Sequence, residues 1–243
     1  MTSGPPTGFR HFHGELDTLK GRLVDMSGKA EAMLALSMDA LLSRDDGLAE
    51  AVLKADAEID SLEIEVEELA VSLLALQQPM ARDLRFIVGA IKISSDLERV
   101  GDHAVNIAEA TQRLIAAGPA TLSGPTPAIT QMAKRSRQML GDAIRAFVRA
   151  DGQAGRVVCS MDDEVDELHE SVFRVLLTHM MENPTNITAS LQYLLVSRNL
   201  ERIGDLATNI AEDAVFLAEG KQIKHHFEER REEGGGRRVE DKQ

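Results

Sequence analysis

The sequence predicts an all-α protein composed of two pseudo-symmetric three-helix bundles. Long stretches rich in Ala, Leu, Val, Ile and Glu show helical periodicity, and aromatic residues make up only 3% of the chain. All seven prolines lie where such stretches would start or stop, as expected because proline disrupts the interior of a helix. A segment at residues 97–109 recurs at residues 200–212, which indicates that one helical unit is present twice.

Six helices follow from this periodicity and from the proline and glycine breaks. In chain order we expect them at 13–43, 47–76, 80–117, 128–150, 155–182 and 185–219. A linker rich in Gly, Pro, Ser and Thr separates the halves at 118–127. The first bundle is therefore expected at 11–118 and the second at 125–226. The remaining residues, 227–243, form a charged, glycine-containing tail that we expect to be disordered.

The repeated segment carries polar side chains in helical register. It reads LERVGDHAVNIAE in the first half and LERIGDLATNIAE in the second. Residues four apart share one face of a helix, so each copy aligns two carboxylates and one carboxamide. These residues are Glu98, Asp102 and Asn106 in the first copy and Glu201, Asp205 and Asn209 in the second.

A second acidic stripe precedes each copy on the neighbouring helix, formed by Asp56 and Asp60 in the first half and by Asp162 and Asp166 in the second. If the two helices are antiparallel neighbours, the stripes face each other. Carboxylates held close together repel, and a multivalent cation relieves that repulsion. Oxygen ligands favour hard ions, and carboxylates in helical bundles also hold iron. The sequence therefore predicts two metal sites, with the ion left open among Fe, Mn, Mg, Ca and Zn.

Simpler explanations for the stripes stay open. Acidic stripes on helices are commonly solvated faces, and Arg99 and Arg202 can each pair with the aspartate three residues on. Gly101 and Gly204 lie beside the core face of their helices. A glycine inside a helix costs about 1 kcal/mol relative to alanine, so we interpret both as sites of close helix packing. His169 lies in the acidic stripe and is either a ligand or a surface histidine.

Composition excludes several classes of function. A net charge of −13 argues against binding to nucleic acid, which needs a basic face. The single cysteine, Cys159, excludes a disulfide framework and a cysteine-rich zinc site, and we expect a buried thiol there. No apolar stretch approaches the roughly 18 residues of a membrane span, so a cytoplasmic protein is the simplest interpretation. The chain also lacks a phosphate-binding loop, a Gly-x-Ser-x-Gly motif and paired Glu-x-x-His motifs, so we expect no enzyme.

Two long segments resemble one known family. The run QQPMARDLRFIVGAIKISSDLERVGDHAVNIAE at 77–109 resembles the PhoU family of phosphate-specific transport system accessory proteins. The run NPTNITASLQYLLVSRNLERIGDLATNIAEDAVFLAEG at 183–220 is similar to the second half of the same family, and HFHGELDTLKGRL at 11–23 is similar to its start. The resemblance covers residues 11–226.

The resemblance implies a tandem repeat of three-helix bundles. It also implies multinuclear metal clusters, because some members of the family hold them with Glu/Asp-x-x-x-Asp motifs. Those motifs match Asp56 with Asp60, Glu98 with Asp102, Asp162 with Asp166, and Glu201 with Asp205. One departure is Leu206, which stands where the family more often has a histidine.

The resemblance further implies a non-enzymatic cytoplasmic regulator of phosphate homeostasis. Such a protein represses the phosphate-starvation response by coupling the ATPase subunit of the phosphate ABC transporter to a membrane sensor histidine kinase. We accordingly expect a homodimer that meets the membrane only through its partners and binds no nucleic acid. The alternative taken from the residues themselves is a carboxylate-rich bundle that binds or stores metal. A third possibility is a helical scaffold whose acidic faces are merely solvated.

Overall fold

The computed structural model describes residues 7–118 and 126–223, and these residues are almost entirely helical. In chain order the elements are α1 (Thr7–Ser43), α2 (Asp46–Gln77), α3 (Ala81–Ala116), α4 (Pro127–Arg149), α5 (Gly152–Cys159), α6 (Asp162–Glu182), the short 3-10 helix η1 (Pro184–Asn186) and α7 (Ile187–Glu219). No helix in this part of the chain has both the length and the apolar composition needed to cross a bilayer.

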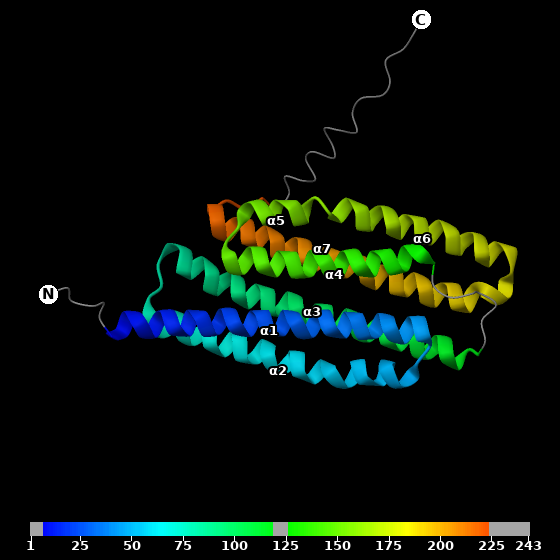
Figure 1. Ribbon diagram of the computed structural model, residues 1–243, viewed down its shortest axis with the longest axis horizontal. Helices are drawn as coiled ribbons and strands as arrows, with labels where there is room; N and C mark the ends of the chain where they lie inside the picture. Colours follow the sequence, from blue (N-terminus) through cyan, green and yellow to red (C-terminus); the bar gives the residue numbers. More distant parts are fainter. Residues whose placement is uncertain (1–6, 119–125, 224–243) are drawn as a thin grey trace, which may run out of the picture.

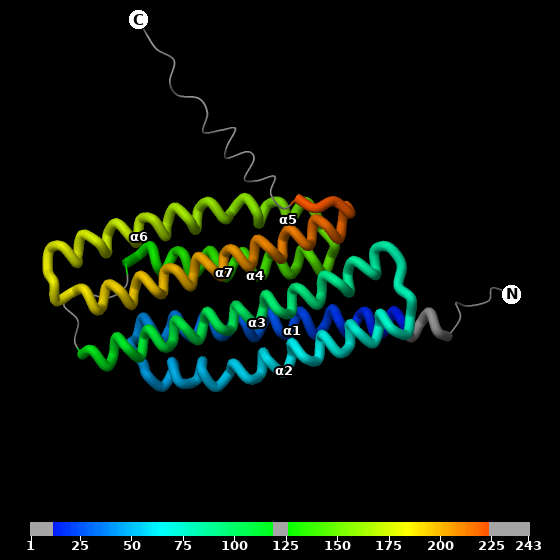
Figure 2. The backbone as a smooth tube through the Cα atoms, turned by 180° about the vertical axis from the view of Figure 1, so that it is seen from behind, coloured from blue at the N-terminus to red at the C-terminus, as the bar shows by residue number. Residues whose placement is uncertain are grey.

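The helices form two bundles that lie side by side along their length (Figure 1). One bundle contains α1, α2 and α3, and the other contains α4, α5, α6 and α7. The bundles join mainly where α3 packs against α7, with a smaller contact between α1 and α4. The turn between α2 and α3 and the turn between α6 and α7 lie at opposite ends of the molecule (Figure 2). The expected fold of two pseudo-symmetric three-helix bundles is confirmed.

Aspartates at equivalent positions start the second helix of each half. The Asp45 carboxylate accepts a hydrogen bond from the Leu48 N–H at 3.1 Å, and the Asp151 carboxylate accepts one from the Ala154 N–H at 3.0 Å. Such caps satisfy backbone donors that lack partners in the first turn of a helix. Gly220 adopts a left-handed conformation with φ of 70° and ends α7.

The prediction of one continuous helix at 155–182 is wrong. The chain forms two helices there, α5 and α6, and the first begins at Gly152. The hydroxyl of Ser160 donates to the Val157 carbonyl at 2.7 Å, and the N–H of Met161 reaches the Val158 carbonyl three residues back. This tight turn separates α5 from α6, whereas α2 runs through the equivalent position unbroken. The central part of the expected linker, 119–125, and the expected tail at 227–243 lie outside the described residues.

Aromatic stacking joins the two bundles near the start of α3. The rings of Phe86 on α3 and Phe147 on α4 stack with their centroids 5.1 Å apart. A Cβ atom on Gly89 would lie 2.7 Å from the Phe147 ring, so this glycine leaves the space that the ring occupies. Phe147 is fully buried. The contact therefore depends on a large side chain on one helix and a missing side chain on the other.

Polar contacts fix the register between α3 and α7. His103 Nδ1 lies 2.9 Å from Asn199 Oδ1, and Lys92 Nζ lies 3.6 Å from the carboxylate of the buried Asp213. In the second repeat the position of His103 is taken by Leu206, which is buried. Buried polar groups need partners, and each of these contacts links one bundle to the other. The departure at Leu206 therefore reflects the different surroundings of the two halves at their common interface.

Two glycines test how tightly α5 packs against α7, because one lies in a close contact and the other in open space. A Cβ atom on Gly155 would lie 2.7 Å from the Ala211 carbonyl oxygen of α7. Because this oxygen belongs to the backbone, the two helices would have to move apart to accommodate a side chain. We expect Gly155→Ala to lower the free energy of unfolding by about 1–3 kcal/mol. Gly21 is an exposed helical glycine with no atom within 4 Å of such a Cβ, so Gly21→Ala should raise it by about 0.5–1 kcal/mol. Urea unfolding measures both, and equal effects would contradict this packing.

Candidate functional site

The first carboxylate cluster lies between α2 and α3 and consists of Asp56, Asp60, Glu63, Glu98 and Asp102. Its members act on one another electrostatically. Burial raises the pKa of Glu98, and repulsion from the other four carboxylates raises it further. The stripes predicted on the two helices therefore face each other.

Gly101 explains how the helices approach closely enough for this cluster to form. A Cβ atom at this position would lie 3.2 Å from Ile59 Cδ1 and 3.5 Å from the Asp56 carboxylate. The glycine thus allows the close packing that the sequence predicted and also leaves room for an acidic side chain. Burial raises the pKa of Asp56, and Asp60 and Asp102 raise it further.

The second carboxylate cluster lies between α6 and α7 and consists of Asp162, Asp166, Glu201 and Asp205. Burial, followed by repulsion from Glu201 and Asp162, raises the pKa of Asp205 to about 6, with a smaller contribution from Asp166. The nearby Arg202 guanidinium opposes this shift. A carboxyl group with such a pKa is partly protonated close to neutral pH.

The packing around the second cluster is looser than around the first. A Cβ atom on Gly204 would lie 3.4 Å from Val165 Cγ1 and 3.8 Å from the Asp162 carboxylate, which are ordinary van der Waals distances, so the close packing predicted at both glycines is seen only at Gly101. The arginines differ between the halves. Arg202 Nη1 lies 3.2 Å from Asp205 Oδ2, whereas Arg99 reaches Asp96 at 3.8 Å. The predicted pairing of the arginine with the next motif aspartate is therefore seen in the second half.

The remaining candidate ligands are less closely gathered. Asn106 is exposed and Asn209 is half-buried, each one helical turn beyond the motif aspartate. His169 Nδ1 lies 2.7 Å from the Ser197 hydroxyl of α7, so this nitrogen is engaged in packing α6 on α7. Across the described residues, no group of three acidic, histidine or cysteine side chains is placed to hold a metal ion. The clusters exist, and their use as metal sites stays a prediction.

Glu63 belongs to the first cluster, although the sequence analysis did not single it out as a ligand. Burial raises the pKa of Glu63, and Glu67 raises it further, while a hydrogen bond with the Ser95 side chain opposes the shift. Its signal in the sequence is position, because it follows Asp60 at helical spacing on the same stripe of α2. The second half has His169 at the equivalent position, and the two clusters therefore differ in charge.

Cys159 is a buried thiol, as the sequence analysis expected. It is 4% exposed, and burial raises its pKa to about 12, with smaller contributions from Glu212 and Asp162. A thiol with that pKa stays protonated at neutral pH and is a poor nucleophile. Cys159 is therefore a packing residue between α5 and the rest of the second bundle.

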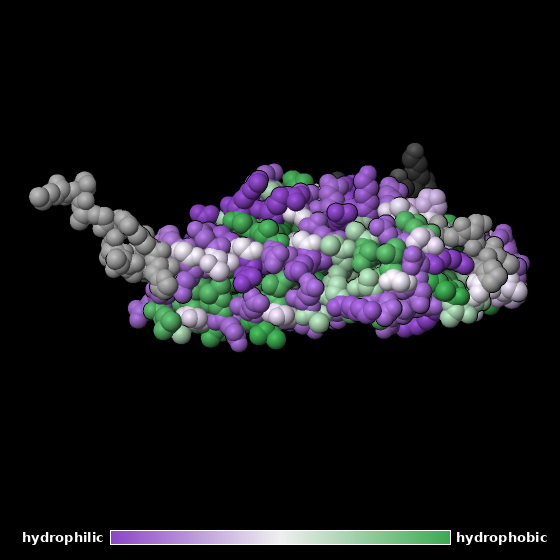
Figure 3. Space-filling model, turned by 60° about the horizontal axis from the view of Figure 1, so that its bottom comes forward, coloured by the Kyte–Doolittle hydropathy of each residue, from purple (hydrophilic) through white to green (hydrophobic). Residues whose placement is uncertain are grey.

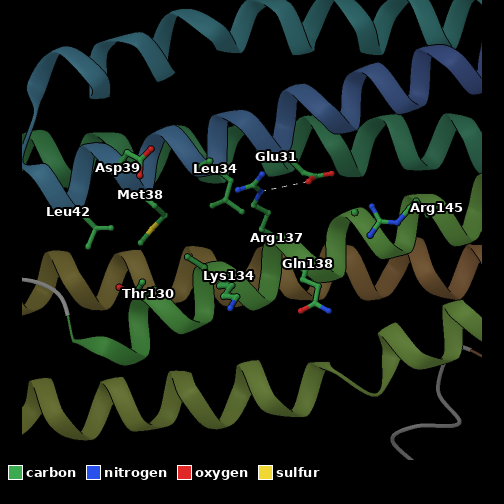
Figure 4. A pocket seen from close by; sticks show the side chains of 13 residues that line it. Glu31, Leu34, Met38, Asp39, Leu42, Thr130, Lys134, Arg137, Gln138 and Arg145 are labelled. Carbon is green, nitrogen blue, oxygen red and sulfur yellow. Dashed lines mark ion pairs between the residues drawn. The ribbon is translucent and has the colours of Figure 1, made fainter.

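Sequence reasoning did not find the groove between α1 and α4 (Figure 4). It has a volume of about 470 Å³, with Leu34, Met38 and Leu42 among its lining residues. Glu31 on the α1 wall faces Arg137 on the α4 wall, and their charged groups are 3.8 Å apart. The groove depends on how the two bundles are placed, which no local pattern specifies.

Comparison with known proteins agrees with this architecture. The PhoU domain family matches the chain twice, at residues 23–111 and 129–214. A phosphate-specific transport system accessory protein PhoU homolog from Caulobacter vibrioides is 44% identical over 209 residues, which are 86% of this chain and 90% of that protein. The homolog of the same name from Clostridium acetobutylicum is 37% identical over 213 residues, which are 87% of this chain and 96% of that protein.

Two crystal structures share the fold. PhoU from Pseudomonas aeruginosa matches with a TM-score of 0.82 at 34% identity, covering 86% of this chain and 100% of that one. The phosphate transport system regulatory protein PhoU from Streptococcus pneumoniae matches with a TM-score of 0.79 at 28% identity, covering 87% and 99%. These relatives are named as accessory or regulatory proteins, and the family is non-enzymatic. Because the family matches both bundles and the relatives align over most of their length, the chain belongs to the PhoU family.

Proposed function

We propose that this protein is a cytoplasmic negative regulator of the phosphate-starvation response. In this role it couples the ATPase subunit of the phosphate ABC transporter to a membrane sensor histidine kinase. The observation that carries the proposal is the 44% identity, across nearly the whole chain, to an accessory protein of the phosphate-specific transport system. A protein of this kind works by binding, and its effect depends on which partners its surfaces hold together.

The geometry supports an adaptor because the molecule offers separate surfaces on opposite sides. The carboxylate clusters lie on the side formed by α2, α3, α7 and α6, which faces the viewer in Figure 2. The groove between α1 and α4 lies on the other side. Contacts between α3 and α7 along their length join the two bundles into one body. Two partners can therefore bind at once without competing for the same residues.

Removing the gene tests this proposal in cells. We expect the deletion strain to express phosphate-starvation genes in phosphate-rich medium, because the repressing link is lost. A reporter for a starvation promoter measures the effect, and a plasmid copy of the wild-type gene should restore repression. Normal repression in the deletion strain would contradict the proposed function.

The second candidate function is binding or storage of metal by the carboxylate clusters. The specific observation in its favour is the raised pKa of Asp205, to about 6, together with the raised pKa values of Asp56 and Glu98. A divalent cation would offset the repulsion between these groups, and Asp162 and Glu201 would be its further ligands in the second cluster. The carboxylates would have to turn toward a common centre to hold the ion.

The pH dependence of stability tests the strain in the second cluster. The pKa of Asp205 is raised from 3.8 to about 6, so the folded protein keeps this proton to higher pH than the unfolded chain does. Stability should therefore fall as the pH rises from about 4 to about 6 and remain lower above that range. The full shift corresponds to about 3 kcal/mol, and we expect about 1 kcal/mol because solvent screens this partly exposed side chain.

Asp205→Asn removes the charge and should remove the part of this dependence that Asp205 contributes. In the presence of a chelator, the variant should be more stable than the wild type by about 1 kcal/mol at pH 7.5 and equal to it at pH 4. The exposed Glu167 of α6 offers a matched control, since Glu167→Gln should leave the profile unchanged. Adding Mn²⁺ or Fe²⁺ should raise the Tm of the wild type and raise that of Asp205→Asn by less, because the first cluster remains intact in this variant. A wild-type Tm that responds to neither ion would contradict metal binding.

A further inference from the structure

We infer that the side of the molecule formed by α2, α3, α7 and α6 binds two copies of one kind of partner segment. The segment is a helix with apolar side chains toward one end and Lys or Arg side chains toward the other. This inference rests on the proposed adaptor function and specifies the chemistry of one of its partners. It comes from exposed apolar side chains that occur at equivalent places in both halves and continue into the carboxylate clusters.

The first apolar patch lies at the turn between α2 and α3 and consists of Val71, Leu76, Met80, Leu84 and Val88. Their exposed fractions are 59%, 72%, 79%, 41% and 40%. Apolar surface is exposed at this end of the molecule, toward the lower left of Figure 3, where it is interspersed with polar surface. Single exposed apolar residues need no explanation, but a group of large ones at one place marks an interaction site.

The second apolar patch lies at the turn between α6 and α7 and consists of Phe173, Leu177, Met181, Ile187 and Leu191. Their exposed fractions are 48%, 44%, 78%, 42% and 46%. The repeat that pairs the motif residues of α3 and α7 also places Ile187 and Leu191 at the positions of the exposed residues of α3. Exposure of large apolar side chains is thus a property of the repeated unit and not of one half.

Each apolar patch continues into a carboxylate cluster along the same stripe. On α3, Leu84 and Val88 lie in helical register with Glu98 and Asp102, which are farther along the helix. On α7, Ile187 and Leu191 precede Glu201 and Asp205 in the same way. From residue 84 to residue 102 the stripe is about 27 Å long, at 1.5 Å per residue. A partner helix of about 20 residues would cover it, with apolar anchors over the patch and basic side chains over the cluster.

Both surfaces lie on one side of the molecule. α1 packs against α2 and α3, and α4 packs against α6 and α7, so these two helices cover the inner faces of the pairs. The faces that α1 and α4 leave uncovered are on the opposite side of these pairs, and α2, α3, α7 and α6 lie nearest the viewer in Figure 2. Because the apolar patches lie at opposite ends of that side, one helix cannot cover both. The structure therefore fits a partner that supplies two equivalent segments.

Charge selects this partner over the other candidates. The acidic clusters repel an anionic membrane surface, which attracts basic segments instead. They also repel the same side of a second copy of this chain, because each copy would present carboxylates to carboxylates. A segment with Lys or Arg side chains meets both the charge and the apolar surface, and electrostatic complementarity of this kind fixes orientation.

A designed peptide tests the inference with the full chain. The probe is a helical peptide of about 20 residues, with Leu at i, i+3, i+4 and i+7 in one half and Lys in the other. Isothermal titration should show two peptides per chain, with binding weakened by salt. Met80→Glu combined with Leu84→Glu should reduce the number to one, and Met181→Glu combined with Ile187→Glu should do the same. All four changes should abolish binding.

The controls distinguish specific binding at this surface from non-specific binding of the peptide. Leu42 is 50% exposed in the groove on the other side, so Leu42→Glu should still bind two peptides. A peptide of the same composition with Leu and Lys evenly mixed should bind at least tenfold more weakly, a loss of about 1.4 kcal/mol or more. All altered positions are exposed, and circular dichroism checks that the variants remain helical.

Several outcomes would overturn the inference. These are no binding, a stoichiometry unaffected by the four glutamates, or equal binding of the mixed peptide. The inference would also be overturned if the protein bound phosphatidylglycerol vesicles and the four substitutions to Glu abolished that binding, because the surface would then be a membrane-binding surface. The proposed function fails separately. Normal repression in the deletion strain would reject the regulator, whereas loss of repression together with no peptide binding would reject only this surface.

Discussion

The close approach of two helices within each bundle is the constraint on which the rest of the structure depends. Gly101 lets α2 pack closely on α3, whereas a Cβ atom at Gly204 would make only ordinary van der Waals contacts between α7 and α6. Apolar side chains fill the inner part of each contact. The same approach holds carboxylates against one another at the outer part of the contact. Their raised pKa values show the cost of that arrangement, which a cation or a basic partner would relieve. Packing and electrostatics in each half thus have a common origin.

Joining two such units produces a molecule with two different sides. On one side the apolar patches and carboxylate clusters occur twice, whereas the groove between α1 and α4 on the other side occurs once. The contact between α3 and α7 is where the halves have diverged, as His103 bonds to Asn199 while its counterpart Leu206 is simply buried. A duplicated surface suits a repeated ligand, and a unique groove suits a single one. The proposed adaptor function would use both.

Much of this could be predicted from the sequence, because the relevant patterns are local. Glu98 and Asp102 share a face by their spacing, and the position of Gly101 indicated where two helices come close. The break between α5 and α6 was not predictable from periodicity, since the apolar pattern continues across Ser160. At the break the Ser160 hydroxyl donates to the Val157 carbonyl, and nearby Gly155 lies against the backbone of α7. The groove was missed because it depends on the placement of one bundle against the other.

The most direct test of the account is a site-resolved NMR titration of the carboxyl groups in the metal-free protein. If the helices hold the carboxylates of each cluster against one another, Asp205 should titrate near pH 6, and its pKa should move down when Glu201→Gln removes the neighbouring charge. If Asp205 titrates near pH 4 and ignores the change at Glu201, the clusters do not exist as described.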